Sequence, residues 1–310
     1  MIEGVTRIHL DTDLGSDTDD LCALAMLLGW EGVELTGVTT NTDPGGIRAG
    51  YTRYALGLAG RGDIPVCAGA EGSLGGLFAS LAFPDYWPVP IDRRPARPGE
   101  ALELLEASIE AGATIVAIGP YTNLALLAAV KPDLLSDVRV VVMGGHVTTP
   151  REGLPQWGVD EDFNVQQDRI AAYIVLRRCR PTVVPLAVTL EVFLRSSHLR
   201  RLRAAGSLGA LIADQAEMHE RDNGRLYLGR SYPELPDDLM NFHYDPLACA
   251  VALGWEGVQV AQIPTLLELT DERLHTSERA GEATLDVVNA VDGPAFEEQW
   301  IRSIERVSAT

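Results

Sequence analysis

The stretch His9–Gly29, HLDTDLGSDTDDLCALAMLLG, concentrates acidic residues where a strand gives way to a helix. Five aspartates fall within ten residues: Asp11, Asp13, Asp17, Asp19 and Asp20. An apolar strand pattern precedes them and an apolar helix pattern follows. Capping of the helix accounts for one or two aspartates, because only the first turn has free N–H groups. Since like charges at this density repel one another, the natural partner of the rest is a cation.

Outside this stretch, short β-type runs alternate with helical patterns, which is typical of an α/β fold with an open, mostly parallel sheet covered by helices. The predicted strands are 6–13, 33–41, 64–69, 113–120, 138–145, 181–188, 258–270 and 283–291. The predicted helices are 19–30, 47–60, 99–112, 122–135, 168–178, much of 193–227, and one starting near 243. No repeat or linker interrupts this order, so we expect a single domain over 1–310. Ligands of such sheets bind beyond the carboxyl ends of the strands, where Asp, Asn, Thr and Gly gather in this chain.

Composition narrows the class of protein. The chain has 310 residues, 46% of them hydrophobic, and a net charge of -19, which argues against nucleic acid and anionic membranes as partners. Its four cysteines lie far apart in apolar surroundings, as buried thiols of a reducing compartment do. The opening residues carry no long apolar run and no segment has membrane-spanning length, so we expect a cytoplasmic protein.

Three kinds of site could use the carboxylates of the acidic loop. An EF-hand fails on spacing, because Ser16 and Cys22 stand where the turn glycine and the final glutamate are needed. A phosphohydrolase could use Asp11 and Asp13 as a DxD pair, but it also needs a cation on the phosphate, and the only lysine is Lys131. A hard-cation site with oxygen ligands remains, whereas zinc is disfavoured because His and Cys are not clustered.

The same residues resemble the inosine–uridine nucleoside hydrolase family, whose first strand ends in DxDPGxDDA before a helix. Further similarities follow in order over about residues 5–305: GRGDIPVCAGA, AIGPYTNLALL, VVMGG, DFNVQQDRIAA and YDPLACAVAL. Each motif is weak alone, but the ordered set is specific. The resemblance implies the family's Rossmann-like core and a homodimer or homotetramer. It also implies Ca²⁺-dependent hydrolysis of a ribonucleoside to free base and ribose, through a metal-bound water and an oxocarbenium-like transition state.

The resemblance also implies a role for each matched position. Asp13 would bind Ca²⁺ and take the proton of the attacking water. The other metal ligands would be the carboxylates of Asp20 and Asp245 and the backbone carbonyl of Thr122. The sugar hydroxyls would be held by Asp19, at the 2′ position, and by Asp162 and Asn164; Met143, at the end of the VVMGG strand, joins these substrate-binding candidates. Asp11 would support the metal loop from behind.

The acidic loop and the C-terminal motif depart from the family pattern. The loop is two residues longer, so Asp17 is an alternative to Asp19 or Asp20. The position of the family's leaving-group acid, usually His, holds Tyr244, with His243 one residue earlier. Both are catalytic candidates, although the ordinary pKa of tyrosine, about 10, makes it a weak acid, and a structural role is the alternative for His243.

Two further loops diverge. In TTNTDPGG, either Asn41 or Asp43 reaches the ribose, the alternative being an Asp-Pro-Gly turn. The stretch LFASLAFPDYWPVP replaces the usual His-Gly segment, and its aromatics or Trp157 either stack on the base or pack the loop. These departures keep a second hypothesis open, a Ca²⁺- and ribose-binding protein of the same fold without turnover, beside the less favoured DxD phosphohydrolase.

Overall fold

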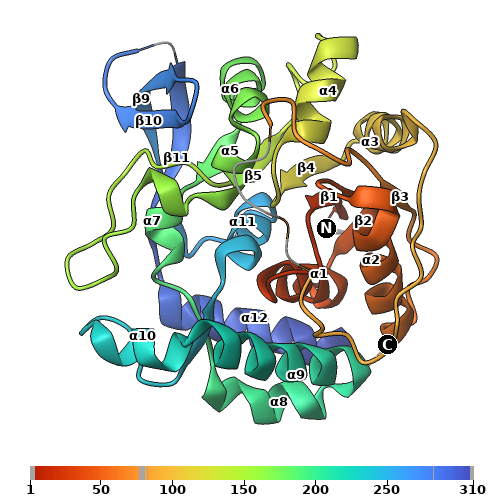
Figure 1. Cartoon of the computed structure of the whole chain (residues 1–310), viewed down its shortest axis with the longest axis vertical. Helices are drawn as coiled ribbons and strands as arrows, with labels where there is room; N and C mark the ends of the chain where they lie inside the picture. Colours follow the sequence, from red (N-terminus) through yellow and green to blue (C-terminus); the bar gives the residue numbers. More distant parts are fainter. Residues whose placement is uncertain (1–3, 77–80, 82, 282, 308–310) are drawn as a thin grey trace.

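The computed structural model describes residues 4–76, 81, 83–281 and 283–307, and these residues form a central nine-stranded sheet (Figure 1). Its strands are β1 (Thr6–Thr12), β2 (Val33–Thr40), β3 (Val66–Ala68), β4 (Thr114–Ala117), β5 (Val140–Met143), β6 (Thr182–Val184), β9 (Val258–Leu269), β10 (Leu274–Glu278) and β11 (Ala283–Val291). Their order is β10-β9-β11-β6-β5-β4-β1-β2-β3. All neighbours from β11 to β3 pair in parallel, and β9 and β10 add an antiparallel edge. The predicted open, mostly parallel sheet is therefore confirmed.

Helices cover both faces of this sheet (Figure 1). Their bounds are α1 (Asp19–Gly29), α2 (Ile47–Leu58), α3 (Glu100–Glu110), α4 (Thr122–Val130), α5 (Phe163–Gln167), α6 (Arg169–Arg178), α7 (Leu186–Thr189), α8 (Leu199–Ala204), α9 (Gly206–Asn223), α10 (Arg225–Ser231), α11 (Tyr244–Ala252) and α12 (Gly293–Val307). Side chains alternate across β4. Val116 joins the core beneath α1, α11 and α12, whereas Ile115 and Ala117 join the core beneath α3, α4 and α6.

Several elements differ from the predicted ones. The predicted strand 181–188 ends at Val184 and is followed by helix α7, and β10 was not predicted. Helix α4 stops at Val130 rather than at residue 135, because Pro132 disfavours helical backbone in the residue before it. The region 193–227 is not one helical run: it opens with β7 (Phe193–Arg195), which pairs with β8 (Leu239–Phe242) in a separate two-stranded sheet of the described chain. Helix α12 was not predicted, although Phe296, Trp300 and Ile304 form a fully buried apolar face along it.

The strand order places a crevice at one point of the sheet. From β1 the chain proceeds through β2 and β3 on one side, and then returns to build β4, β5 and β6 on the other. The loops after β1 and β4 therefore leave in opposite directions, which opens the crevice where ligands bind in such folds. Within the described residues, no helix combines the length and the apolar character that crossing a bilayer requires.

Candidate active site

A buried hydrogen-bond network beneath the crevice fixes the end of β1. The Asp11 carboxylate accepts hydrogen bonds from Thr39 Oγ1 at 2.5 Å, Asn123 Nδ2 at 2.7 Å and Asn41 Nδ2 at 3.0 Å. Burial nevertheless dominates and raises the pKa of Asp11 to about 6. These contacts occupy both carboxylate oxygens and join the ends of β1, β2 and β4, so Asp11 supports the loop that follows it.

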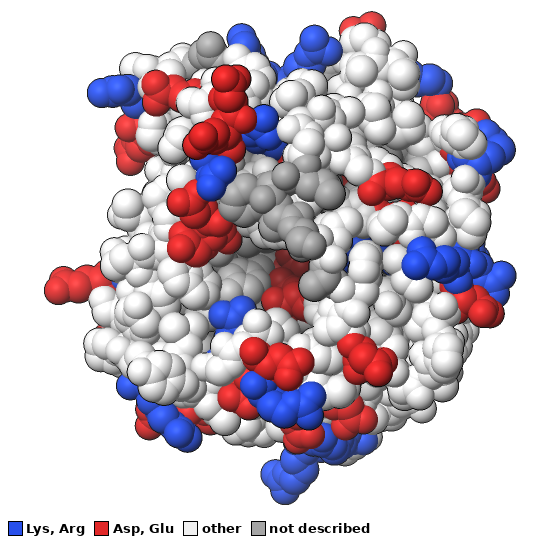
Figure 2. Space-filling view, viewed as in Figure 1, with Lys and Arg blue, Asp and Glu red and all other residues white. Residues whose placement is uncertain are grey.

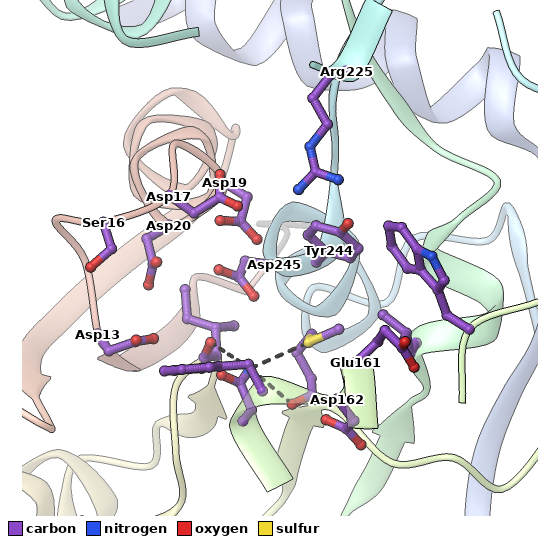
Figure 3. A pocket seen from close by; sticks show the side chains of 16 residues that line it. Asp13, Ser16, Asp17, Asp19, Asp20, Glu161, Asp162, Arg225, Tyr244 and Asp245 are labelled. Atoms are coloured by element: carbon purple, nitrogen blue, oxygen red, sulfur yellow. Dashed lines mark hydrogen bonds between the residues drawn. The ribbon is translucent and has the colours of Figure 1, made fainter. Parts of the chain in front are cut away.

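Above this network lies a cavity of about 410 Å³, at the carboxyl ends of the strands. Its lining includes these predicted site residues: Asp13, Met143, Asp19, Asp20, Asp162, Asn164, Tyr244 and Asp245. Ser16, Asp17, Ile118, Trp157, Glu161, Phe163, Leu186 and Arg225 complete it. Figure 2 shows acidic side chains inside a hollow near the middle of this face, and Figure 3 shows the aspartates of the 13–20 loop facing Asp245.

Three buried carboxylates meet at the start of two helices. Asp19 and Asp20 open α1 and Asp245 lies in the first turn of α11. Among the described residues they form a group in which one ligand atom from each lies within 4.8 Å of the others. Burial, followed by the repulsion among neighbouring carboxylates, raises the pKa of all three well above the ordinary value. Oxygen ligands whose charges repel in this way fit a hard divalent cation, which would remove the repulsion.

Asp13 lies on the same cavity but outside this group of three, and it has a cationic neighbour. Arg48 Nη2 of α2 is 3.6 Å from Asp13 Oδ2, and the arginine is almost fully buried. Burial raises the pKa of Asp13, and Arg48 opposes that rise. The loop after β4 approaches closely: a Cβ at Gly119 would lie 2.7 Å from Asp13 Oδ1 and 2.8 Å from Asn41 Oδ1. Any side chain at position 119 would therefore clash with Asp13, so this position requires glycine.

The opposite side of the cavity is built from the loops after β5. Asp162 accepts the Gly145 backbone N–H at 2.6 Å and caps α5 through Val165 N, while burial raises its pKa to about 6. Asn164 donates through Nδ2 to the carbonyl of Ile118 at 2.9 Å and to that of Met143 at 3.3 Å. These bonds hold Asp162 and Asn164 in fixed orientations, as side chains that read a sugar need to be.

Four predicted site residues do not line the cavity in the described structure. Asn41 donates to Asp11, and Asp43 accepts the backbone N–H groups of Arg48 and Ala49 at the start of α2. The hydroxyl of Thr122 donates to Asp168; the proposed metal-binding carbonyl of Thr122 remains a prediction.

His243 is the fourth. It is fully buried, with its ring 4.2 Å from that of Trp300 and 5.9 Å from that of Phe296. Burial lowers its pKa well below the ordinary value, and neither ring nitrogen has a hydrogen-bond partner among the described residues. The structure thus places His243 in the core beside α12, whereas Tyr244, the next residue, faces the cavity.

The aromatic residues divide between the cavity and the surrounding loops. Trp157 lines the cavity and meets Phe242 edge-on at 5.6 Å. By contrast, Trp87 stacks on Tyr51 at 4.4 Å, and Tyr86 donates to Asp222, so both pack the loop that contains them. Residues 77–80 and 82 of LFASLAFPDYWPVP lie outside the described residues. Of the aromatic residues predicted to stack on a base, Trp157 thus lines the cavity, and the aromatic side chains of Phe163 and Tyr244 line it as well.

Sequence reasoning missed both arginines of the site. Arg48 lies in an amphipathic helix and has the sequence context of a surface residue. Arg225 follows a helix break at Gly224, whose φ of +62° ends α9. The Asn-Gly pair at 223–224 is a helix-stop signal that could have located this break. Asp17, the predicted alternative to Asp19 or Asp20, lines the cavity and accepts hydrogen bonds at Oδ1 from Thr18 N and Asn241 Nδ2, both at 2.5 Å.

Comparisons with known proteins identify the family and the fold of this chain. A family model described as inosine-uridine preferring nucleoside hydrolase matches residues 8–298. A pyrimidine-specific ribonucleoside hydrolase RihA from Salmonella schwarzengrund is 30% identical over 230 residues, which cover 67% of this chain and 69% of that protein. The purine-preferring ribonucleoside hydrolase from Gardnerella vaginalis has a similar structure, with a TM-score of 0.76, 22% identity and coverage of 98% and 99% of the two chains. An inosine-uridine preferring nucleoside hydrolase from Bacillus anthracis also has a similar structure, with a TM-score of 0.71 and 18% identity. The similarity covers 97% of this chain and 99% of that chain. The chain therefore belongs to the inosine-uridine preferring nucleoside hydrolase family and is an N-glycosyl hydrolase.

Proposed function

We propose that this enzyme hydrolyses the N-glycosidic bond of ribonucleosides in a Ca²⁺-dependent reaction, with Asp13 as the general base. One observation carries the proposal: three repelling, buried carboxylates share a strand-end cavity with a fourth, Asp13, and with the fixed side chains of Asp162 and Asn164. The family supplies the reaction class, and the cavity supplies a place for a sugar between two sets of polar groups. A volume of about 410 Å³ is within the range of small-molecule sites.

The residues that line the cavity would have different roles according to their positions. Asp20 and Asp245 would hold the cation, and Asp19, which lies in the same group, would bind the cation or the ribose 2′-hydroxyl. Asp13 and the backbone carbonyl of Thr122 remain the two further cation ligands that the family resemblance implies. When bound, Ca²⁺ would orient the sugar hydroxyls and lower the pKa of a water molecule. Asp13 would accept a proton from the attacking water, and because burial raises its pKa it is a stronger base than an exposed aspartate. Asp162 and Asn164 would hold the other sugar hydroxyls.

The carboxylates also suit the charge that develops as the bond breaks. Loss of the base gives the ribose ring oxocarbenium character, which places positive charge near C1′. Negative groups prearranged around that charge stabilise the transition state because they need no reorganisation. The acidic lining of the cavity thus favours the reaction in two ways. It would hold the cation, and it would stabilise the positive charge that develops near C1′.

The two alternatives are less well supported. A DxD phosphohydrolase would need Asp11 as a reacting group, but its oxygens are engaged by Thr39, Asn41 and Asn123. Lys131 lies at the surface and pairs with Glu106. A binding protein without turnover disagrees with membership in a family of N-glycosyl hydrolases, and the first assay below distinguishes the two.

The test is a reducing-sugar assay with inosine, adenosine, guanosine, uridine and cytidine, because the related enzymes named above differ in base preference. We expect ribose release in Ca²⁺, loss of release after chelation, and recovery when Ca²⁺ is returned. Asp13→Ala should lower kcat by about 10²–10⁴-fold without preventing Ca²⁺-dependent stabilisation. Absence of release from all five nucleosides, with Ca²⁺ bound, would contradict the proposal. Cytoplasmic location and homodimeric or homotetrameric assembly remain predictions, which cell fractionation and sedimentation analysis would check.

A further inference from the structure

Arg225 is the cationic residue among the described residues that line the cavity. It is the first residue of α10, directly after the left-handed Gly224. A positive side chain at a helix N-terminus opposes the helix dipole and is unfavourable there. Its placement therefore does not stabilise α10 and calls for another explanation.

The guanidinium of Arg225 is not held by a hydrogen bond or an ion pair within the described residues, although its charge helps to lower the pKa of the nearby Asp17. No hydrogen bond or ion pair joins it to another described side chain, and its Nε is buried without a partner. Its Cζ lies 6.0 Å from the centre of the Trp157 ring and 5.9 Å from that of Phe242, near the outer limit of about 6 Å for a cation–π contact. Figure 3 shows the side chain reaching into the space between Asp19 and Tyr244. Its donors remain available to a ligand.

The chemistry of the guanidinium indicates which part of a nucleoside it meets. It is always charged and only donates, so it binds groups that carry lone pairs or negative charge. On the function proposed above, the ribose hydroxyls would face the carboxylates, which accept hydrogen bonds. A 5′-phosphate is disfavoured, because its nearly two permanent negative charges would meet the seven acidic residues of the cavity: Asp13, Asp17, Asp19, Asp20, Glu161, Asp162 and Asp245. A leaving base, by contrast, develops a single negative charge, and only as the bond breaks. The remaining part is the base, whose flat ring fits beside Trp157.

We propose that Arg225 binds the acceptor edge of the leaving base and stabilises the base as it departs with the bonding electrons. The proposal rests on the hydrolase function above. The C1′–N bond breaks, and its electron pair goes to the base nitrogen. The water oxygen forms the new bond to C1′, and its proton passes to Asp13. The base, held as an anion by Arg225, then takes a proton from solvent, which gives free base and ribose.

Other groups near the base do not supply this function. A tyrosine hydroxyl is ordinarily a weak acid, with a pKa of about 10, so Tyr244 suits the donation of a hydrogen bond rather than of a proton. His243 points into the core. Asp162, which accepts two backbone N–H groups, is assigned to the sugar hydroxyls rather than to the base. Electrostatic stabilisation by Arg225 thus takes the place of protonation by an acid.

The experiment compares two leaving groups. Wild type, Arg225→Met, Arg225→Lys and the control Arg230→Met, an exposed arginine of the same helix, are assayed with the best nucleoside and with 4-nitrophenyl β-D-ribofuranoside. For the nucleoside, kcat of Arg225→Met should fall about 10²–10³-fold, as on removal of a donor that stabilises developing negative charge. For the nitrophenyl riboside it should fall less than about threefold, because nitrophenolate departs unaided. Arg225→Lys should recover part of the loss, and Arg230→Met should match wild type.

A second readout does not require turnover. Calorimetry with free hypoxanthine and uracil should show binding at least about tenfold weaker in Arg225→Met than in Arg230→Met. Equal losses on both ribosides, or no loss on either, would overturn the proposal. So would unchanged binding of the bases. If wild type releases no ribose but its base binding still depends on Arg225, the hydrolase proposal fails while the base contact stands. If wild type releases ribose but Arg225→Met changes neither the kinetics nor the binding of free bases, the base contact of Arg225 fails while the hydrolase proposal stands.

Discussion

Arg48 Nη2 lies 3.6 Å from Asp13 Oδ2, and the arginine side chain is 1% exposed. Arg48 Nε also donates to the carbonyl of Thr42 at 2.9 Å, and its guanidinium lies 5.0 Å from the ring centre of Phe83. A buried cation is thus fixed beside the proposed general base. It lowers the pKa that burial raises, and so favours the charged, proton-accepting form of Asp13.

Substitution of Arg48 should impair both stability and the pH profile. Arg48→Met removes one partner of a buried pair and should cost roughly 3 kcal/mol in unfolding free energy, measured by urea denaturation. Without Arg48 the pKa of Asp13 rises, so the acidic limb of kcat/KM should move to higher pH. Arg48→Lys keeps the charge and should move the limb less. An unchanged acidic limb in Arg48→Met would show that Asp13 is not the base.

Asp245→Asn should stabilise the metal-free protein. The pKa of Asp245 is raised by burial and by Asp19 and Asp20, so ionisation of this carboxylate is less favourable in the folded state than in the unfolded state. The folded state therefore holds more protons, and the carboxylate destabilises the protein increasingly as pH rises from 3.8 through the folded pKa. Asparagine does not titrate.

Thermal denaturation of Asp245→Asn and wild type should be compared from pH 4 to pH 8 in chelator. The advantage of the variant should grow with pH. Addition of Ca²⁺ should then stabilise wild type more than the variant, because one proposed ligand is lost. Asp133→Asn, at an exposed position, is the control and should follow wild type in both media. A wild type that does not respond to Ca²⁺ would contradict the proposed metal site.

His243→Leu should leave kcat/KM within about threefold of wild type, because the ring lies in the core rather than on the cavity. Unpartnered buried nitrogens cost about 1–3 kcal/mol, so the unfolding free energy should hold or rise despite the lost ring contacts. The lowered pKa means that the unfolded state binds the proton, and stability is lost as pH falls below 6.5. The variant should lose less stability on acidification. A 100-fold loss of activity would instead identify His243 as the leaving-group acid.

Tyr244→Phe should reduce kcat/KM by about tenfold or less, which corresponds to one hydrogen bond. Burial keeps the pKa of the hydroxyl so high that it stays protonated throughout the assay range, so the alkaline limb of the rate profile should not move. Steady-state kinetics from pH 6 to pH 10 would check this. A loss of 10³-fold, or disappearance of the alkaline limb, would make Tyr244 the acid and leave little role for Arg225.

The sequence by itself determined the class of fold and most of the residues of the site. Alternating strand and helix periods predict the parallel sheet, because each period reflects local backbone geometry. Asp13, Asp19 and Asp20 could be placed on the site because they lie where a predicted strand gives way to a helix, and such positions converge at one edge of a parallel sheet. Asp162 and Asp245 were assigned through the resemblance of their motifs to the nucleoside hydrolase family. Local signals suffice for features of this kind.

Tertiary structure alone decided which neighbours these residues meet. His243 and Tyr244 are consecutive residues, yet His243 packs in the core against Trp300 and Tyr244 faces the cavity. The turn into α11 points their side chains in different directions. The side chain of Asp43 accepts a backbone N–H group at the start of α2 and does not line the cavity. Arg48 and Arg225 reach the site from helices whose sequences look like surface segments. Contacts between residues distant in the chain depend on how elements pack, and packing is set by the whole core rather than by local sequence.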